Sequence, residues 1–203
     1  MASTKKLPIP VVIGTRDTAI NYTRREAVRA VVVNAWGHIA ILYSRRDNYY
    51  KLPGGGIEPG ENHHAAVERE VKEETGALVR VFDVGCVAII EEFRDTLHQF
   101  SYLYLAETVN DVGEPKLTPE EIQDDLLHWW SPPADAMRVM EIVEPRSDIG
   151  RSIKDRDLYL LQQGMWQYKN KVAIPQSEMS GFPVDKSGPA NAESPIEPED
   201  MVE

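Results

Sequence analysis

The chain has 203 residues, of which 42% are hydrophobic, and it carries a formal charge of −11. This length allows one domain of about 150 residues with extensions, which is large enough to bury a core. The negative charge argues against broad binding of nucleic acid, because a phosphate backbone would be repelled.

Residues 1–20 are expected to form an N-terminal extension. They include two lysines but no sustained apolar stretch, so they do not resemble a signal peptide. Apolar runs further along the chain are too short to span a membrane, and the single cysteine, Cys86, gives no sign of an oxidising compartment. We therefore expect a cytoplasmic protein, with the nucleus as the alternative, that does not bind membranes.

Three short strands are predicted in the first quarter of the chain. The β-branched residues at 27–34 predict a buried strand, and residues 39–44 predict its hairpin partner after a turn at Gly37. A third strand is predicted at 49–52. It leads directly into a segment rich in glycine.

Three basic residues in this region are candidate substrate contacts, namely Arg45, Arg46 and Lys51. They lie close in sequence to the glycine-rich segment, where a phosphate group could bind. The alternative for Arg45 and Arg46 is that they are ordinary charges at the tip of a hairpin.

A loop followed by one helix is predicted from Pro53 onward. Proline lacks a backbone donor and glycine loses much conformational freedom in a regular element, so Pro53 and the glycines at 54–56 predict a tight loop. Asn62 is a suitable N-cap, residues 63–75 contain no glycine or proline, and Gly76 is a typical helix stop.

Three carboxylates are expected on one face of this helix. Glu70, Glu73 and Glu74 stand at i, i+3 and i+4, so they project from a single turn. Like charges at these spacings repel each other, and a hard cation would supply the missing attraction. Magnesium binds a few carboxylate oxygens together with waters and substrate phosphates. The alternative is an ordinary solvated acidic face.

The region from Gly55 to Ala77 has a specific spacing. Glycine is followed after five residues by Glu61, and after seven more by the run REVKEETGA that begins at Arg69. This is the Nudix box, although Ala77 is smaller than the usual last residue. The chain therefore resembles the Nudix hydrolases, which cleave a nucleoside diphosphate linked to another group. The resemblance implies an α/β fold, an α/β/α sandwich with a mixed β-sheet, over residues 21–169.

The resemblance also implies roles for residues of the box. Glu70, Glu73 and Glu74, with the carbonyl of Gly54, would hold Mg²⁺, for which Mn²⁺ could substitute. Arg69 would pair with glutamates of the box through parallel hydrogen bonds. Water would attack a phosphorus atom, and one glutamate, which the sequence does not identify, would accept the proton. Loop residues that could contact the substrate are Gly55 and Gly56.

Further strands are predicted after the helix. Residues 78–93 alternate through two strand segments broken near Gly85, and 97–107 predict another strand. Related enzymes often bring an additional acid to the metals from outside the box. Glu91 and Glu92 are candidates, and a solvated hairpin end is the alternative.

A second acidic group lies in the polar segment 109–125 and includes Glu120 and Glu121. A loop at about this place carries an extra metal ligand or catalytic base in some members of the family. The alternative is structural, because Thr118 and Glu121 have the spacing of a capping box that starts a helical turn.

The C-terminal third predicts a strand at 126–130 and helices at 134–143 and 153–168. The last helix could pack on the core, line a substrate pocket or support a homodimer. Residues 170–203 contain five prolines and seven acids against two lysines. This composition predicts an acidic, proline-rich, disordered tail.

The substrate is the least determined part of the prediction. A small-molecule diphosphate is expected, and a small nucleotide is favoured over a diphosphoinositol polyphosphate, because the latter would need a strongly cationic pocket. A non-catalytic Nudix-fold binding module is the alternative of another class. The complete set of glutamates favours an enzyme, since a pure binder has no need of clustered carboxylates.

Overall fold

The computed structural model describes residues 6–110 and 113–172, so most of the predicted tail lies outside the described residues. These ranges contain an eight-stranded sheet. The strands are β1 (Val11–Ile13), β2 (Thr23–Val33), β3 (Ile39–Ser44), β4 (Tyr49–Lys51), β5 (Leu78–Val81), β6 (Ala88–Arg94), β7 (Leu97–Asn110) and β8 (Leu126–Ser131). The helices are α1 (His63–Thr75), α2 (Pro119–Gln123), α3 (Pro133–Ile142) and α4 (Asp148–Gln167), followed by the π-helical turn η1 (Tyr168–Val172).

The sheet is mixed, as predicted. Its order is β1-β6-β7-β2-β3-β4, with β5 paired to β7 and β8 paired to β3. Strands β2 and β7 run parallel over the whole length of β2, and β1 runs parallel to β6, whereas the remaining strand pairs are antiparallel. Strands β2 and β3 share only the pair Val33 and Ile39, so the two halves of the sheet diverge from that hairpin.

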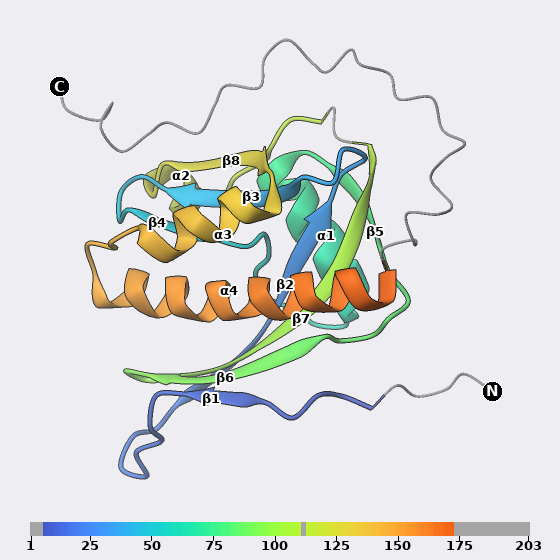
Figure 1. Ribbon diagram of the computed structural model, residues 1–203. Coiled ribbons are helices and arrows are strands. Elements are labelled where there is room, and N and C mark those ends of the chain that lie inside the picture. The colour runs from blue at the N-terminus through green and yellow to red at the C-terminus, as the bar shows by residue number, and fades with distance from the viewer. Residues whose placement is uncertain (1–5, 111–112, 173–203) are drawn as a thin grey trace, which may run out of the picture. The chain divides into compact units, whose positions relative to one another are not determined.

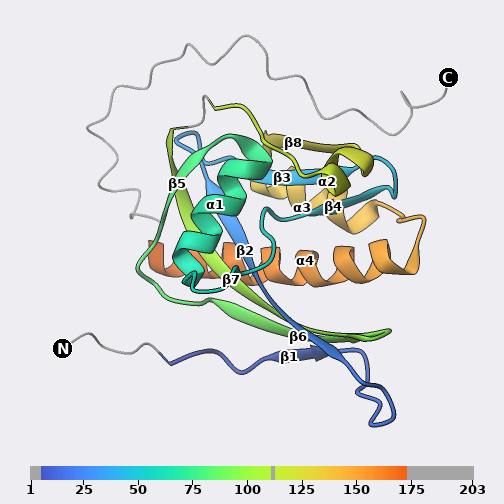
Figure 2. The ribbon, with the colours of Figure 1, turned by 180° about the vertical axis from the view of Figure 1, so that it is seen from behind.

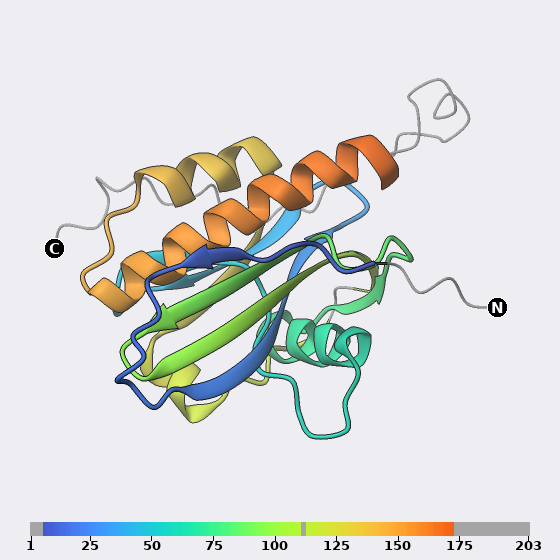
Figure 3. The same ribbon diagram turned by 90° about the horizontal axis from the view of Figure 1, so that it is seen from below.

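Helices cover both faces of the sheet. In Figure 1 the long helix α4 crosses in front of β2 and β7, and Figure 2 shows α1 on the opposite face. The view from below places α1 and α4 on opposite sides of the adjacent strands β1, β6, β7 and β2 (Figure 3). The predicted α/β/α sandwich is therefore confirmed.

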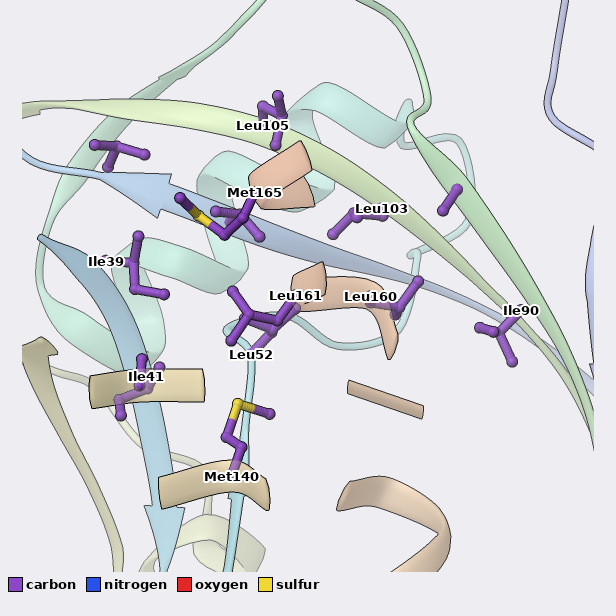
Figure 4. Packing of buried hydrophobic residues seen from close by; sticks show 14 residues of the cluster. Ile39, Ile41, Leu52, Ile90, Leu103, Leu105, Met140, Leu160, Leu161 and Met165 are labelled. Atoms are coloured by element: carbon purple, nitrogen blue, oxygen red, sulfur yellow. The ribbon is translucent and has the colours of Figure 1, made fainter. Parts of the chain in front are cut away.

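The alternation of side chains along β2 explains this arrangement. Val28, Ala30 and Val32 pack in the cluster that includes α1. Val31 and Val33 point to the other face and pack in the cluster that includes α3 and α4. Figure 4 shows this second cluster, in which Leu52 lies beside Leu161. Because both faces are buried, the strand reads as a nearly continuous apolar run from position 27.

Helix α1 begins and ends where the sequence predicts. The side chain of Asn62 accepts a hydrogen bond from the backbone N–H of Ala65, and Gly76 ends the helix in the left-handed conformation at φ 77°. The buried positions of the helix include Val67 and Val71, which hold it on the sheet. Its acidic face is thereby turned toward the glycine loop.

Other elements differ from the prediction mainly at their ends. Helix α4 begins five residues before the predicted position 153, because Ser147 caps it by accepting from the N–H of Gly150. Glycine at position 150 also lets the carboxylate of Asp47 lie close to this end of the helix, since a Cβ atom there would overlap it. Residues 11–13 of the expected extension form the edge strand β1. Among the described residues, none of the helices is long and apolar enough to cross a membrane.

Candidate active site

The glycine loop lies against β2 like an additional strand. The N–H groups of Val28 and Ala30 donate to the carbonyls of Gly55 and Pro53 at 2.9 Å. Gly54 has a φ of 137°, and a Cβ at this position would overlap the carbonyl oxygen of Val28. The loop can approach β2 so closely because residue 54 is glycine.

Glu74 is the most deeply buried carboxylate of the box, with 1% of its surface exposed. Its Oε2 accepts from the N–H of Gly54 at 2.7 Å, and its Oε1 accepts from Nζ of Lys51 at 2.9 Å. Burial raises the pKa of Glu74 to about 7, against the lowering effect of the Lys51 ammonium and the Gly54 N–H. The loop and the helix are therefore joined through this one carboxylate.

Arg69 organises the other acids of the box. Its guanidinium makes two hydrogen bonds of 2.9 Å to the carboxylate of Glu61. It also donates to Glu70 at 2.8 Å and to Glu73 at 3.1 Å, and to the carbonyl of Gly56 at 2.9 Å. Hydrogen bonds with Glu61 and Glu70 raise the pKa of this guanidinium further. One arginine thus holds three acids and the loop together.

Glu70 lies beneath the loop. A Cβ at Gly55 would overlap its carboxylate, so glycine at this position lets the acid approach the loop backbone. Only 8% of Glu70 is exposed. Burial raises the pKa of Glu70, and Arg69 opposes that effect.

The donor set suits a hard divalent cation, which binds carboxylate and carbonyl oxygens. In the part of the chain that the structure describes, no three acids, histidines or cysteines are already gathered around one point as a metal cage. Arg69 and Lys51 instead take up part of the negative charge of the box. Arg69 binds one oxygen of Glu70 and one of Glu73, so the second oxygen of each carboxylate could bind an ion. The residues therefore fit Mg²⁺ or Mn²⁺.

The predicted cationic contacts separate into two groups. Lys51 is brought to Glu74. Arg45 and Arg46, in the turn between β3 and β4, instead form ion pairs of 3.2 and 3.3 Å with Asp125 and Asp124. Their surroundings match the alternative of charges at a hairpin tip.

The additional acids also differ from one another. Glu92 is 1% exposed and accepts from Arg94 at 3.0 Å. The alternative that it lies at a solvated hairpin end is therefore wrong for this residue. Glu91 lies 2.8 Å from Nε2 of His98. Glu121 completes the capping box with Thr118 at the start of α2, and Glu120 lies in the first turn of that helix. The predicted capping box is therefore confirmed.

Several charged residues near the site were not singled out from the sequence. Arg25 on β2 donates to Gln99 on β7 at 2.9 Å, and Gln99 is the register partner of Glu92 on β6. Arg29 is 5% exposed, and burial followed by the charge of Arg156 lowers its pKa to about 10. The available signal was an even spacing: residues 25 and 29 are four positions apart, so both arginines lie on one face of β2.

In metal-free protein, Glu74 is expected to make the free energy of unfolding fall as the pH rises from 4.5 to about 7. The folded state binds this proton more tightly than the unfolded state, so the stabilisation is complete below pH 4.5 and is lost above about pH 7. A pKa difference of this size corresponds to on the order of 3 kcal/mol. Urea unfolding with chelator across this range would measure it. The variant Glu74→Gln should lack this part of the slope, and equal slopes would contradict the assignment.

Together the fold and the site define an α/β/α-sandwich protein with an oxygen-donor site between a glycine loop and an acidic helix. The model of the NUDIX domain matches residues 23–149, which is more than half of the chain. The chain belongs to the Nudix family, and the predicted resemblance is confirmed.

Individual relatives match over limited regions or at low identity. The putative 8-oxo-dGTP diphosphatase YtkD of Bacillus subtilis is 45% identical over 49 residues, which are 24% of this chain and 31% of that protein. The MutT protein of Methanosarcina mazei is 18% identical, with a TM-score of 0.48 over 68% of this chain and 94% of that chain. A UDP-X diphosphatase is 17% identical, with a TM-score of 0.49 over 72% of this chain and 64% of that chain.

Proposed function

We propose that this protein is a Mg²⁺-dependent hydrolase that cleaves the diphosphate linkage of a small nucleotide by attack of water on phosphorus. The proposal rests chiefly on one observation. Glu74 is buried against the N–H of Gly54 and the ammonium of Lys51, with its pKa raised to about 7. A carboxylate kept at this energetic cost, directly beneath a glycine loop, is suited to act on a phosphate-bearing ligand.

Each residue of the site has a distinct part in the proposed reaction. Glu70, Glu73 and Glu74, with the carbonyl of Gly54, hold the cations, and Arg69 keeps the acids at their positions. When bound, the cations neutralise charge on phosphoryl oxygens and lower the pKa of bound water. Glu70 and Glu74 are the candidates to accept the proton of the attacking water, because both carboxylates lie against the backbone of the glycine loop.

Two observations favour a nucleotide over a diphosphoinositol polyphosphate. The relative YtkD is named a putative 8-oxo-dGTP diphosphatase, which points to nucleoside triphosphates, including oxidised ones. A highly phosphorylated inositol would need many free cations. Arg45 and Arg46 are already paired with Asp125 and Asp124, and the chain has a formal charge of −11.

Removal of divalent metal is expected to abolish the activity, and Mg²⁺ should restore it. The purified protein would be incubated with 8-oxo-dGTP, unmodified nucleoside triphosphates, ADP-ribose, a nucleotide sugar and a diphosphoinositol polyphosphate. Release of the monophosphate product or of inorganic phosphate would be measured with Mg²⁺, with Mn²⁺, and with EDTA before and after addition of excess Mg²⁺. Hydrolysis that persists in EDTA would contradict the metal requirement. No hydrolysis of any compound would favour the non-catalytic binding module.

A further inference from the structure

Helix α4 carries two charged residues in its buried stripe. Arg156 is 2% exposed and Asp157 is fully buried, and they share this stripe with Leu160 and Leu161. A buried ion pair is costly to desolvate, and an apolar pair of similar size is often as stable or more stable. The contacts of this pair therefore indicate what it contributes beyond stability.

The carboxylate of Asp157 binds the backbone just before the glycine loop. Its Oδ2 accepts from the N–H of Leu52 at 2.9 Å. Its Oδ1 accepts from Nε of Arg156 at 2.7 Å, and Nη1 of Arg156 lies 3.5 Å from Oε2 of Glu92 on β6. Nε of Arg29 on β2 is 3.8 Å from Oδ2 of Asp157. Asp157 thus joins α4 to β2 and to the entry of the loop, and its partner Arg156 extends the contact to β6.

Leu52 stands between the two groups that hold Glu74. Lys51 precedes it and binds Oε1 of Glu74, and Gly54 follows two residues later and binds Oε2. Strand β4 ends at Lys51, where its pairing with β3 stops. The N–H of Leu52 is therefore secured by Asp157 rather than by a neighbouring strand, while the side chain of Leu52 packs beside Leu161 (Figure 4).

We propose that Asp157 is a positioning residue for the metal-binding carboxylate Glu74. By fixing the backbone at Leu52, it sets the places of the Lys51 ammonium and the Gly54 N–H, and these two donors set the place of Glu74. Helix α4, far from the Nudix box in the sequence, is thereby part of the machinery that shapes the metal site. This inference rests on the proposed metal-dependent function, although its geometric part can be tested without metal.

The test compares Asp157→Ala and Asp157→Asn with Leu160→Ala. The last variant removes a buried apolar group from the same helix, so it destabilises the fold without touching the hydrogen bonds to the loop. Two quantities would be measured well below the unfolding temperature of each variant. They are the affinity for Mn²⁺ by calorimetry and the hydrogen exchange of the Gly54 amide in metal-free protein.

Asp157→Ala is expected to weaken Mn²⁺ binding by about 10- to 100-fold, the usual effect of losing a residue that orients a metal ligand. Exchange of the Gly54 amide should accelerate by a factor of about 10 or more. For Asp157→Asn, the Mn²⁺ affinity and the exchange rate should lie between those of wild type and Asp157→Ala, because the amide oxygen of asparagine can still accept from the N–H of Leu52. Leu160→Ala should leave the Mn²⁺ affinity within about twofold of wild type.

The proposal would be overturned by equal Mn²⁺ affinities in Asp157→Ala and Leu160→Ala. It would also be overturned if the Gly54 amide exchanged at the wild-type rate in both variants of Asp157. If Asp157→Ala does not fold, Asp157→Asn decides by the same two measurements. Wild-type protein that binds no Mn²⁺ would count against the proposed function. In that case exchange of the Gly54 amide still decides whether Asp157 positions the loop.

Discussion

Glu74→Gln is expected to lower the rate of diphosphate hydrolysis by about 1,000-fold or more, with a much smaller change in KM. In the proposed mechanism the carboxylate contributes a metal ligand and negative charge that an amide cannot supply. The glutamine has one carbonyl oxygen for the two donors that Glu74 satisfies, the Lys51 ammonium and the Gly54 N–H. Its NH₂ group would face one of those donors, so the position of the loop is also disturbed.

The matched control is Glu68→Gln. Glu68 lies on the same helix but is exposed, so the same chemical change there should leave kcat within about twofold of wild type. Steady-state kinetics on the best substrate of the panel, with circular dichroism to verify folding, would measure both variants. A folded Glu74→Gln enzyme that retains more than about a tenth of the wild-type kcat would show that Glu74 is not essential.

Helix α1 and the glycine loop before it were predictable from the residues of these segments alone. The cap at Asn62, the stop at Gly76 and the absence of helix breakers between them specify α1 without reference to the rest of the chain. The strands were also predictable in type, because β-branched residues cluster between turns. The predicted ends of helices and strands were less accurate where a cap or a neighbouring strand sets the end of the element. An example is the start of α4, which is set by the cap at Ser147.

Contacts between distant segments account for what the sequence did not show. Asp157 and Leu52 are 105 positions apart, and no local pattern reveals that a carboxylate in an apolar helical stripe will bind that particular N–H. For the same reason Glu92 could be read as a solvated strand end, although Arg94 and Arg156 enclose it. Spacing predicts which side chains share a face, whereas tertiary packing decides which of them meet.

The glycine loop tolerates no side chain at its first glycine, Gly54, if β2, the loop and Glu74 are to stay in contact. The N–H of Gly54 binds Glu74, and the residue has a φ of 137°, a region used almost only by glycine. A Cβ would overlap the carbonyl oxygen of Val28, which belongs to the backbone of a central strand and cannot turn away as a side chain could. The loop would have to leave β2 to relieve this contact.

Gly54→Ala is therefore expected to destabilise the fold by about 3 kcal/mol or more and to lower kcat by about 100-fold or more. Gly60→Ala is the matched control. Gly60 also has a positive φ, 83°, but no atom lies within 4 Å of the added Cβ. Gly60→Ala should therefore lower the free energy of unfolding only by the backbone strain, about 1–2 kcal/mol, and should keep a nearly wild-type kcat. Urea unfolding and steady-state kinetics would measure both. Similar losses in the two variants would mean that conformational strain, rather than contact of the loop with β2, determines the requirement for glycine.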